Sequence, residues 1–316
     1  MKMSKFKKSV IAAVSVFLCL CITAAFVIFI KKDNKSSIAK GEGSTASTGE
    51  ISQTTVPATS ATVTESQTES ATATTVKPTE KPTEPYTQNT EIMYYPSFKI
   101  EGALPQKEAV SGSWFDDAVF IGDSVSVMLT MYESSVDRLG KAQFLTAGSL
   151  SATNALWDVS DHSVHPKFNG KKQKVEDSIA QMQGVNKVYI MLGMNDITSV
   201  GVNNGIKNFE ELCNRILAKN PNVQIYVQSV TPLISGSKSC VPDEGKLNNM
   251  TIYQYNTKLA DLAQKRGWYF VNVAEVMLDG KGYLNKDYCS DPEVMGLHFT
   301  TSGCKVWIDY LLTHTP

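Results

Sequence analysis

The chain has 316 residues, and its 30 Lys and Arg nearly balance 31 Asp and Glu, which leaves a formal net charge of −1 at pH 7. This balance gives no electrostatic case for binding nucleic acid. The six cysteines form no CxxC pair and no cluster with histidine, so the sequence has no pattern for a zinc site.

The N-terminus combines a basic start with a long apolar segment. Residues 1–8 carry four lysines, and residues 10–30 follow without a charge. A segment of this length can cross a bilayer as one helix. A cleaved signal peptide also begins with basic residues, but this run ends in Lys31-Lys32 without a small-residue cleavage site. We therefore predict an uncleaved transmembrane signal anchor over residues 9–30, with residues 1–8 in the cytoplasm.

Residues 31–90 differ in composition from the rest of the chain. They consist mainly of Ser, Thr, Ala, Glu, Gln and Pro, and they repeat Lys-Pro-Thr-Glu at 77–80 and 81–84. Such a segment cannot bury enough apolar surface to offset the entropy lost on ordering. We predict a disordered Ser/Thr/Pro-rich linker.

Apolar residues return after the linker, and residues 91–316 are long enough to form one domain with its own core. Runs with strand character lie at residues 119–121, 143–146, 187–192, 223–228 and 268–272. Runs with helical apolar spacing lie at residues 125–134, 151–158, 175–182, 206–219, 250–266 and 303–313. This alternation predicts an α/β fold, a three-layer α/β/α sandwich around a central, mostly parallel five-stranded sheet.

The stretch around Ser124 is the first candidate for a functional site. An apolar run ends at Gly122-Asp123-Ser124, and apolar residues at helical spacing follow at once, which predicts a strand, a sharp turn and a helix. Ligands of open α/β sheets bind beyond the carboxyl ends of the strands, where the Ser124 hydroxyl could act as a nucleophile. The alternative is that Ser124 only caps the helix and Gly122 only serves the turn.

Three further stretches carry candidate residues. Gly148 follows the second predicted strand, Asn195 and Asp196 follow the third, and His298 precedes the last predicted helix. Each has a structural interpretation, as a turn glycine, as helix caps and as a surface histidine. The functional interpretation is an oxyanion hole that uses Gly148 and Asn195, with His298 as general base.

In these motifs the chain resembles the SGNH hydrolase superfamily, also called GDSL esterases and lipases. The four sequence blocks of that family are matched in order by Gly122-Asp123-Ser124, by Gly148, by the Gly-x-Asn-Asp at 193–196 and by His298. The resemblance, which covers about residues 118–313, implies an SGNH, flavodoxin-like fold in which Ser124 is the nucleophile and His298 the general base. It also implies an oxyanion hole made by Ser124, Gly148 and Asn195, and a reaction that needs no metal or cofactor.

The sequence departs from the family pattern at the triad acid. The family usually has an aspartate three residues before the histidine, and here that position is Met295, which cannot orient an imidazole. Three outcomes are open: Asp291 or Glu293 supplies the carboxylate, a backbone carbonyl orients His298 in a dyad, or the domain is weakened or non-catalytic. We expect an active enzyme with Asp291 ahead of Glu293, because Pro292 biases Asp291 to an extended conformation.

The four cysteines of the domain fall into two groups. Cys213 and Cys304 lie on apolar helical faces and are expected in the core. Cys240 and Cys289 lie in polar stretches, where a disulfide between them would clamp the loop before His298 in an extracellular domain. Two free thiols are the equal alternative.

Together these features predict a single-pass membrane protein whose extracellular domain is a serine esterase, with O-acetyl esters of cell-wall or extracellular carbohydrate as the first-choice substrates. Two alternatives stay open: a non-catalytic carbohydrate-binding relative of such esterases, and an O-acyltransferase that uses the same site. The expected partners are an ester-bearing small molecule or polysaccharide, and the membrane through the N-terminal helix, without nucleic acid. We expect the esterase domain to be monomeric.

Overall fold

The computed structural model describes residues 97–243 and 245–316. The predicted signal anchor at residues 9–30 and the predicted linker at residues 31–90 lie outside these residues. Within the described part of the chain, every helix is too short or too polar to cross a bilayer.

Five parallel strands form the main sheet, in the order β2-β1-β5-β6-β7. Each coincides with one of the predicted strands to within two residues, and all pairings are parallel, so the predicted sheet is confirmed. The strands are β1 (Ala118–Gly122), β2 (Gln143–Thr146), β5 (Lys187–Met191), β6 (Gln224–Gln228) and β7 (Tyr269–Val271).

An aromatic row crosses the whole sheet and fixes the register of its strands. Each strand contributes one ring, and neighbouring ring centroids lie 4.3–5.3 Å apart. Such same-face pairs between adjacent strands stabilise one register over its one-residue slips, because a slip would turn every ring to the other face. In strand order the rings are those of Phe144, Phe120, Tyr189, Tyr226 and Tyr269.

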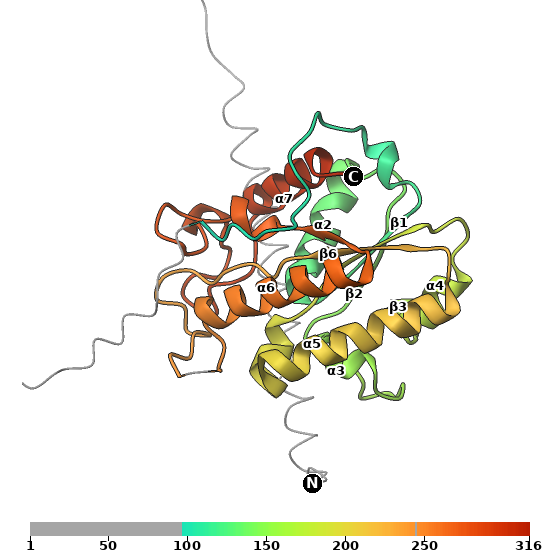
Figure 1. Cartoon of the computed structure of the whole chain (residues 1–316), viewed down its shortest axis with the longest axis horizontal. Coiled ribbons are helices and arrows are strands. Elements are labelled where there is room, and N and C mark those ends of the chain that lie inside the picture. The colour runs from blue at the N-terminus through green and yellow to red at the C-terminus, as the bar shows by residue number, and fades with distance from the viewer. Residues whose placement is uncertain (1–96, 244) are drawn as a thin grey trace, which may run out of the picture. The chain divides into compact units, whose positions relative to one another are not determined.

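Helices cover both faces of the sheet, as predicted (Figure 1). On one face, α2 (Ser124–Val136) contacts α7 (Thr301–Thr313). On the other face, α5 (Met194–Lys219) contacts the three remaining helices. These are α3 (Ala152–Ala155), α4 (Val175–Gln181) and α6 (Asn249–Arg266).

The structure differs from the sequence prediction in three elements. The helix α5 begins at Met194 rather than at residue 206, because a first short helix joins the predicted one across a kink at Gly201 (φ 78°, ψ 170°). The helix α3 is only four residues long. An unpredicted hairpin pairs β3 (Lys167–Phe168) with β4 (Lys171–Lys172), since its lysine-rich strands carry no apolar alternation that could reveal them.

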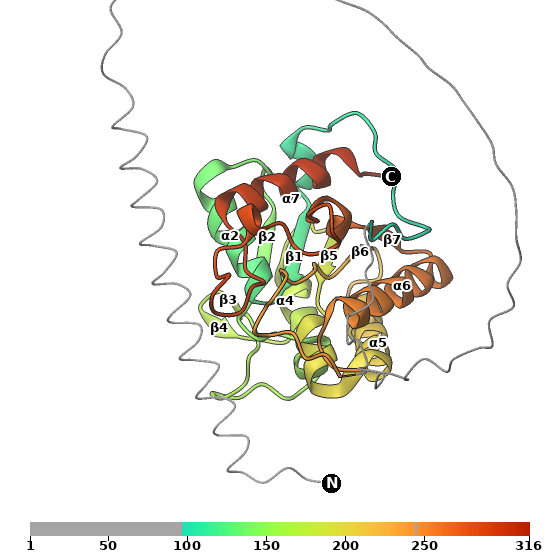
Figure 2. The ribbon, with the colours of Figure 1, turned by 90° about the vertical axis from the view of Figure 1, so that its left-hand side faces the viewer.

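The carboxyl ends of the parallel strands gather at one edge of the sheet, which is where the candidate residues lie. Gly122 ends β1, and its neighbours across the sheet are Thr146 and Met191 at the ends of β2 and β5. The loops after β6 and β7 lie at the left in Figure 1, and that end of the sheet faces the viewer in Figure 2. This edge is therefore the place to look for a site.

Candidate active site

The turn after β1 presents Ser124 as the first residue of α2. Asp123 caps this helix, with its carboxylate accepting a hydrogen bond of 3.0 Å from the N–H of Val125. Gly122 is required by close packing, because a Cβ at this position would lie 1.9 Å from the Ser126 Oγ. The turn therefore folds α2 tightly back over β1 and leaves the Ser124 side chain at the sheet edge.

Three side chains form a continuous line of hydrogen bonds at this edge. The Oγ of Ser124 lies 2.9 Å from the Nε2 of His298, and the Nδ1 of His298 lies 2.7 Å from an Asp291 carboxylate oxygen. His298 is only 1% exposed, whereas Ser124 is half-buried. This is the geometry of a serine nucleophile, a general base and an orienting acid.

A hairpin-like loop brings Asp291 opposite His298 although seven residues separate them. The N–H of Ser290 donates to the His298 carbonyl at 2.8 Å, and Cys289 forms an antiparallel bridge with Phe299. Between these points the chain turns back on itself, with the N–H groups of residues 294–296 all donating to the Asp291 carbonyl. We call residues 289–299 the His298 loop.

Met295 and Glu293 take other positions in the His298 loop. Met295 stands where the family has its aspartate, and its carbonyl accepts a hydrogen bond from the Ser237 hydroxyl. Glu293 is exposed, and its backbone carbonyl contacts the Lys238 ammonium. Of the two predicted acids, the structure brings only Asp291 to His298.

The Asp291 carboxylate is built into a donor-rich setting. Its second oxygen accepts hydrogen bonds from the N–H groups of Leu297 at 3.0 Å and His298 at 3.1 Å, and from the Cys289 thiol at 3.4 Å. Burial alone would raise the pKa of Asp291, but the hydrogen bond from His298, its positive charge when protonated and the backbone donors outweigh burial and lower this pKa. Asp291 is thus held as a carboxylate that accepts the Nδ1–H of His298.

Asn195 lies in the first turn of α5, before the predicted start of this helix at residue 206. Its side-chain amide donates to the Leu150 carbonyl at 3.1 Å and, over a longer 3.3 Å, to the Asp123 carboxylate. The preceding Gly193 allows close packing, because a Cβ there would lie 2.4 Å from the ring of Tyr255. The amide is therefore fixed beside the Ser124 turn.

Gly148 lies in the turn between β2 and α3, next to the end of β1. The N–H of Ala147 donates to the carbonyl of Gly122 at 3.1 Å, which fastens this turn to the Ser124 turn. Among the described residues, no acceptor takes up the N–H of Gly148. The structure therefore places three possible oxyanion donors around Ser124: two backbone N–H groups and the amide of Asn195.

Two buried aspartates support these turns. Asp196 was expected to cap its own helix; instead its carboxylate caps α3, accepting from the N–H groups of Ala152 at 3.0 Å and Thr153 at 2.9 Å. Asp123 both caps α2 and accepts from Asn195. Burial raises the pKa of Asp123 to about 6, against the opposing effects of its Val125 hydrogen bond and of His298. These aspartates connect the three strand-end turns to one another.

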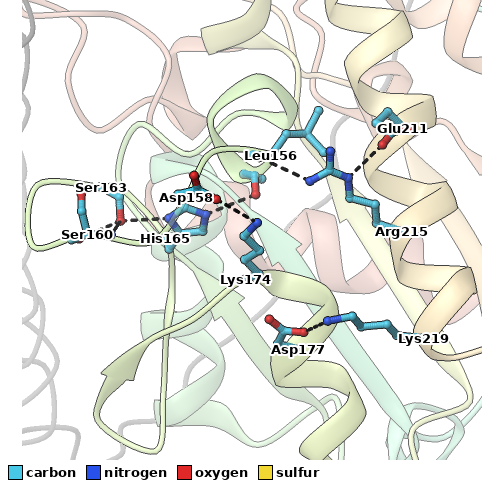
Figure 3. Close-up of polar contacts among 11 residues, drawn as sticks. Leu156, Asp158, Ser160, Ser163, His165, Lys174, Asp177, Glu211, Arg215 and Lys219 are labelled. Atoms are coloured by element: carbon cyan, nitrogen blue, oxygen red, sulfur yellow. Dashed lines mark hydrogen bonds and ion pairs between the residues drawn. The ribbon is translucent and has the colours of Figure 1, made fainter.

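The other histidines have structural positions. One ring nitrogen of His165 lies 2.9 Å from the Ser163 hydroxyl, and the other lies 3.2 Å from the Ala155 carbonyl oxygen. The contact with Ser163 is drawn in Figure 3. His314 stacks on Tyr310, and His162 is exposed. Sequence reasoning that singled out His298 among the four is consistent with this geometry.

Two contacts of the site were not anticipated. The thiol of Cys289 touches the Asp291 carboxylate, and Asp123 holds the amide of Asn195. The two-residue spacing of Cys289 and Asp291 is visible in the sequence, but only the hairpin brings the thiol toward the carboxylate. Of the two alternatives for Cys240 and Cys289, the structure has the free thiols: Cys213, Cys240, Cys289 and Cys304 are all unbonded to another cysteine.

No group of three His, Cys, Asp or Glu side chains in residues 97–243 and 245–316 is arranged to hold a metal ion. The polar atoms at the site instead form hydrogen bonds with one another.

Residues 120–306 match the GDSL-like Lipase/Acylhydrolase family. No match was found among curated proteins. Among solved structures, a GDSL-like lipase from Bacteroides thetaiotaomicron is 15% identical, with a TM-score of 0.45 over 62% of this chain and 86% of that one. The aryl esterase of M. smegmatis is 16% identical (TM-score 0.43, covering 62% and 96%). A carbohydrate acetylesterase from Sinorhizobium meliloti is 13% identical (TM-score 0.41, covering 62% and 96%).

Proposed function

Because the chain belongs to the GDSL-like lipase/acylhydrolase family, we propose that Ser124, His298 and Asp291 are the nucleophile, general base and orienting acid of its esterase site. The chain is a GDSL-type acylhydrolase. The observation that carries the assignment of residues is the unbroken line of hydrogen bonds from Ser124 through His298 to Asp291. This line of hydrogen bonds supports Asp291, in place of a residue at position 295, as the carboxylate that orients the imidazole.

The first half-reaction forms an acyl-enzyme. The Ser124 Oγ attacks the ester carbonyl carbon while its proton passes to the Nε2 of His298, 2.9 Å away. The tetrahedral intermediate then collapses, the carbon–oxygen bond to the alcohol breaks, and His298 gives its proton to the leaving alcohol oxygen. Asp291 stays ionised and stabilises the imidazolium that exists between these two steps.

The oxyanion of the intermediate is stabilised by donors fixed in advance. The N–H groups of Ser124 and Gly148 are two of them, and Asn195 supplies the third by giving up its longer 3.3 Å bond to Asp123. A single donor of this kind lowers the activation free energy by about 3–4 kcal/mol. In the second half-reaction His298 takes a proton from water as the water oxygen attacks the acyl carbon. The bond from this carbon to the Ser124 Oγ then breaks, His298 returns the proton to Ser124, and the acid is released. A sugar hydroxyl in place of water would make the same site an O-acyltransferase.

Replacement of the nucleophile tests this assignment. We expect the full chain carrying Ser124→Ala to hydrolyse p-nitrophenyl acetate about 10⁴-fold or more slowly than the wild type. Ser126→Ala is the matched control, because Ser126 lies two residues along the same helix, and its rate should stay within a few-fold. Equal rates for Ser124→Ala and wild type would remove Ser124 as the nucleophile.

We further propose that the esterase domain faces the cell exterior and removes acyl groups, O-acetyl first, from cell-wall or extracellular carbohydrate. The support is the apolar segment at residues 10–30 and the linker at residues 31–90, which together would tether the domain and let it reach substrates at a distance. The test compares acetate released from O-acetylated polysaccharide with butyrate released from tributyrin. Carbonate extraction of membranes tests the anchor, and recovery of the chain in the soluble fraction would contradict it.

A further inference from the structure

The loops after β6 and β7 enclose a half-open cavity of about 250 Å³ at the same edge of the sheet as Ser124. The loops meet where the N–H of Leu284 donates to the Leu233 carbonyl at 3.0 Å. The lining is mostly apolar, with one aromatic ring: it includes Leu233, Ile234, Ser237, Cys240, Pro242 and Tyr283. We call this the Tyr283 cavity.

The wall of the Tyr283 cavity is joined directly to the His298 loop. The N–H of Ile234 donates to the Gly296 carbonyl at 3.0 Å, and the Ser237 hydroxyl donates to the Met295 carbonyl. Gly296 packs so closely that an added Cβ would lie 2.6 Å from the side chain of Ile234, and its φ of +73° also favours glycine. The cavity and the catalytic histidine thus belong to one packed unit.

The His298 loop decides which part of an ester points toward the cavity. Gly148 and Asn195 follow β2 and β5, the two neighbours of β1, so the oxyanion donors flank β1 on both sides. The carbonyl oxygen of the ester turns toward these donors, while the alcohol oxygen must lie beside the Nε2 of His298 to receive its proton. Because the loop that carries His298 is hydrogen-bonded to the cavity wall, a substituent on this alcohol oxygen extends toward the cavity.

We propose that the Tyr283 cavity binds the alcohol part of the ester, as a group of sugar-ring size. This inference rests on the proposed function, because it takes His298 as the proton donor to the leaving alcohol. A volume of about 250 Å³ is below the usual range for drug-sized ligands and suits a single ring. The ring of Tyr283 can pack on the apolar face of a pyranose.

A second cavity of about 480 Å³ does not compete for this role. It lies beside Ser97, Lys99 and Glu275, and its lining includes no residue of the His298 loop.

The test varies the alcohol part of the ester and, by comparing acetyl with butyryl esters of one alcohol, the acyl part separately in the full chain. With acetyl esters, Tyr283→Ala should lower kcat/KM for a mono-O-acetylated methyl glucoside about 10-fold, mainly through KM, as expected for losing one buried aromatic contact. The same variant should leave kcat/KM for ethyl acetate within twofold. Tyr283→Phe keeps the ring and should retain most of the activity on the sugar ester.

Protection of Cys240 from alkylation gives a second measurement that does not depend on the folding of a variant. Cys240 is a free, half-exposed thiol in the cavity wall, so methyl glucoside at saturating concentration should slow its reaction with iodoacetamide several-fold. The inference is overturned if the sugar does not protect Cys240 from alkylation. It is also overturned if Tyr283→Ala lowers kcat/KM equally for ethyl acetate and the sugar ester, or if the size of that decrease depends on the length of the acyl group. Ser124→Ala distinguishes failure of the proposed function from failure of the cavity inference. Activity that survives Ser124→Ala refutes the proposed function. Activity that depends on Ser124 but does not change in Tyr283→Ala refutes only the role of the Tyr283 cavity.

Discussion

The two halves of the site are held in place in different ways. Ser124, Gly148 and Asn195 stand just beyond the ends of three neighbouring parallel strands, so the sheet itself sets their separation. His298 and Asp291 stand on a loop outside any strand of the sheet, closed by its own hydrogen bonds. The first half follows from the topology, and the second depends on how one loop is built.

This difference explains why the motif is kept on one side and shifted on the other. A residue moved along a strand end would leave the site, because the strand carries it away from Ser124. In the His298 loop, two antiparallel chain segments face one another, so a carboxylate seven residues before the histidine reaches it as well as one three residues before. The acid can change its place in the sequence while keeping its place in space.

The largest effect that tests this comparison comes from the acid. Asp291→Asn should lower kcat by a factor between about 10² and 10⁴, because an amide at this point offers a donor to Nδ1 and favours the wrong tautomer of His298. The measurement is kcat on p-nitrophenyl acetate across a pH series.

Glu293→Gln is the matched control for the acid. Glu293 is an exposed carboxylate of the same loop, and its substitution should leave kcat within twofold. The reverse pattern, with Glu293→Gln inactive and Asp291→Asn active, would show that the loop rearranges when substrate binds.

The strand-end half could be predicted well from the sequence. The apolar run before Gly122 and the alternation of strands and helices locate Ser124 and Gly148 correctly. Asn195 was placed at the right strand end but outside the predicted helix, because the short first helix of α5 breaks at Gly201 and its few residues show too little apolar periodicity. Strand ends are predictable because the sheet repeats one geometry.

For the half of the site on the His298 loop, the sequence could only narrow the orienting acid to a choice between Asp291 and Glu293, with a dyad as the alternative. Pro292 favoured Asp291, but nothing in the sequence shows that the His298 loop closes as a hairpin with residues 294–296 turned onto one carbonyl. The sequence left a Cys240–Cys289 disulfide and two free thiols as equal alternatives for a related reason. The argument for the disulfide used composition alone, whereas Cys289 is turned toward the carboxylate of Asp291 instead.

Asn195 tests the strand-end half with the next largest effect. Asn195→Ala should lower kcat about 10²–10³-fold with little change in KM, since the amide acts on the oxyanion more than on the bound ester. Thr198→Ala, an exposed position in the same helix, is the control. A loss expressed only in KM would show that Asn195 binds the substrate rather than the intermediate.

Asp123 links the turn after β1 to the turn after β5, because it accepts hydrogen bonds from Val125 and Asn195. We expect its ionisation to change the stability of the folded domain. Its pKa is about 6 in the folded domain, compared with 3.8 for an unperturbed aspartate, so the folded state binds the proton more tightly than the unfolded chain does. Stability therefore falls as pH rises from about 4 to 6, by about 2–3 kcal/mol, and the loss is complete above about pH 6. Asp123→Asn keeps an acceptor for Val125 and cannot ionise.

Urea unfolding at pH 4, 5, 6 and 7 measures this prediction. The stability of Asp123→Asn relative to wild type should increase with pH over this range and then level off. Asp261→Asn, at an exposed position on α6, corrects for the general loss of one negative charge. A constant difference between Asp123→Asn and wild type at all four pH values would contradict a buried, titrating Asp123.

The smallest expected change in kcat is that of Cys289→Ala. This variant tests how far the His298 loop depends on its side chains to hold Asp291 in place. Burial raises the pKa of the Cys289 thiol to about 12, so it stays protonated and donates to Asp291. A thiol is a weak donor, and the same carboxylate oxygen keeps two backbone N–H donors, so Cys289→Ala should change kcat by no more than about threefold. A loss as large as that of Asp291→Asn would mean that the thiol, and not the backbone of the hairpin, holds the acid against His298.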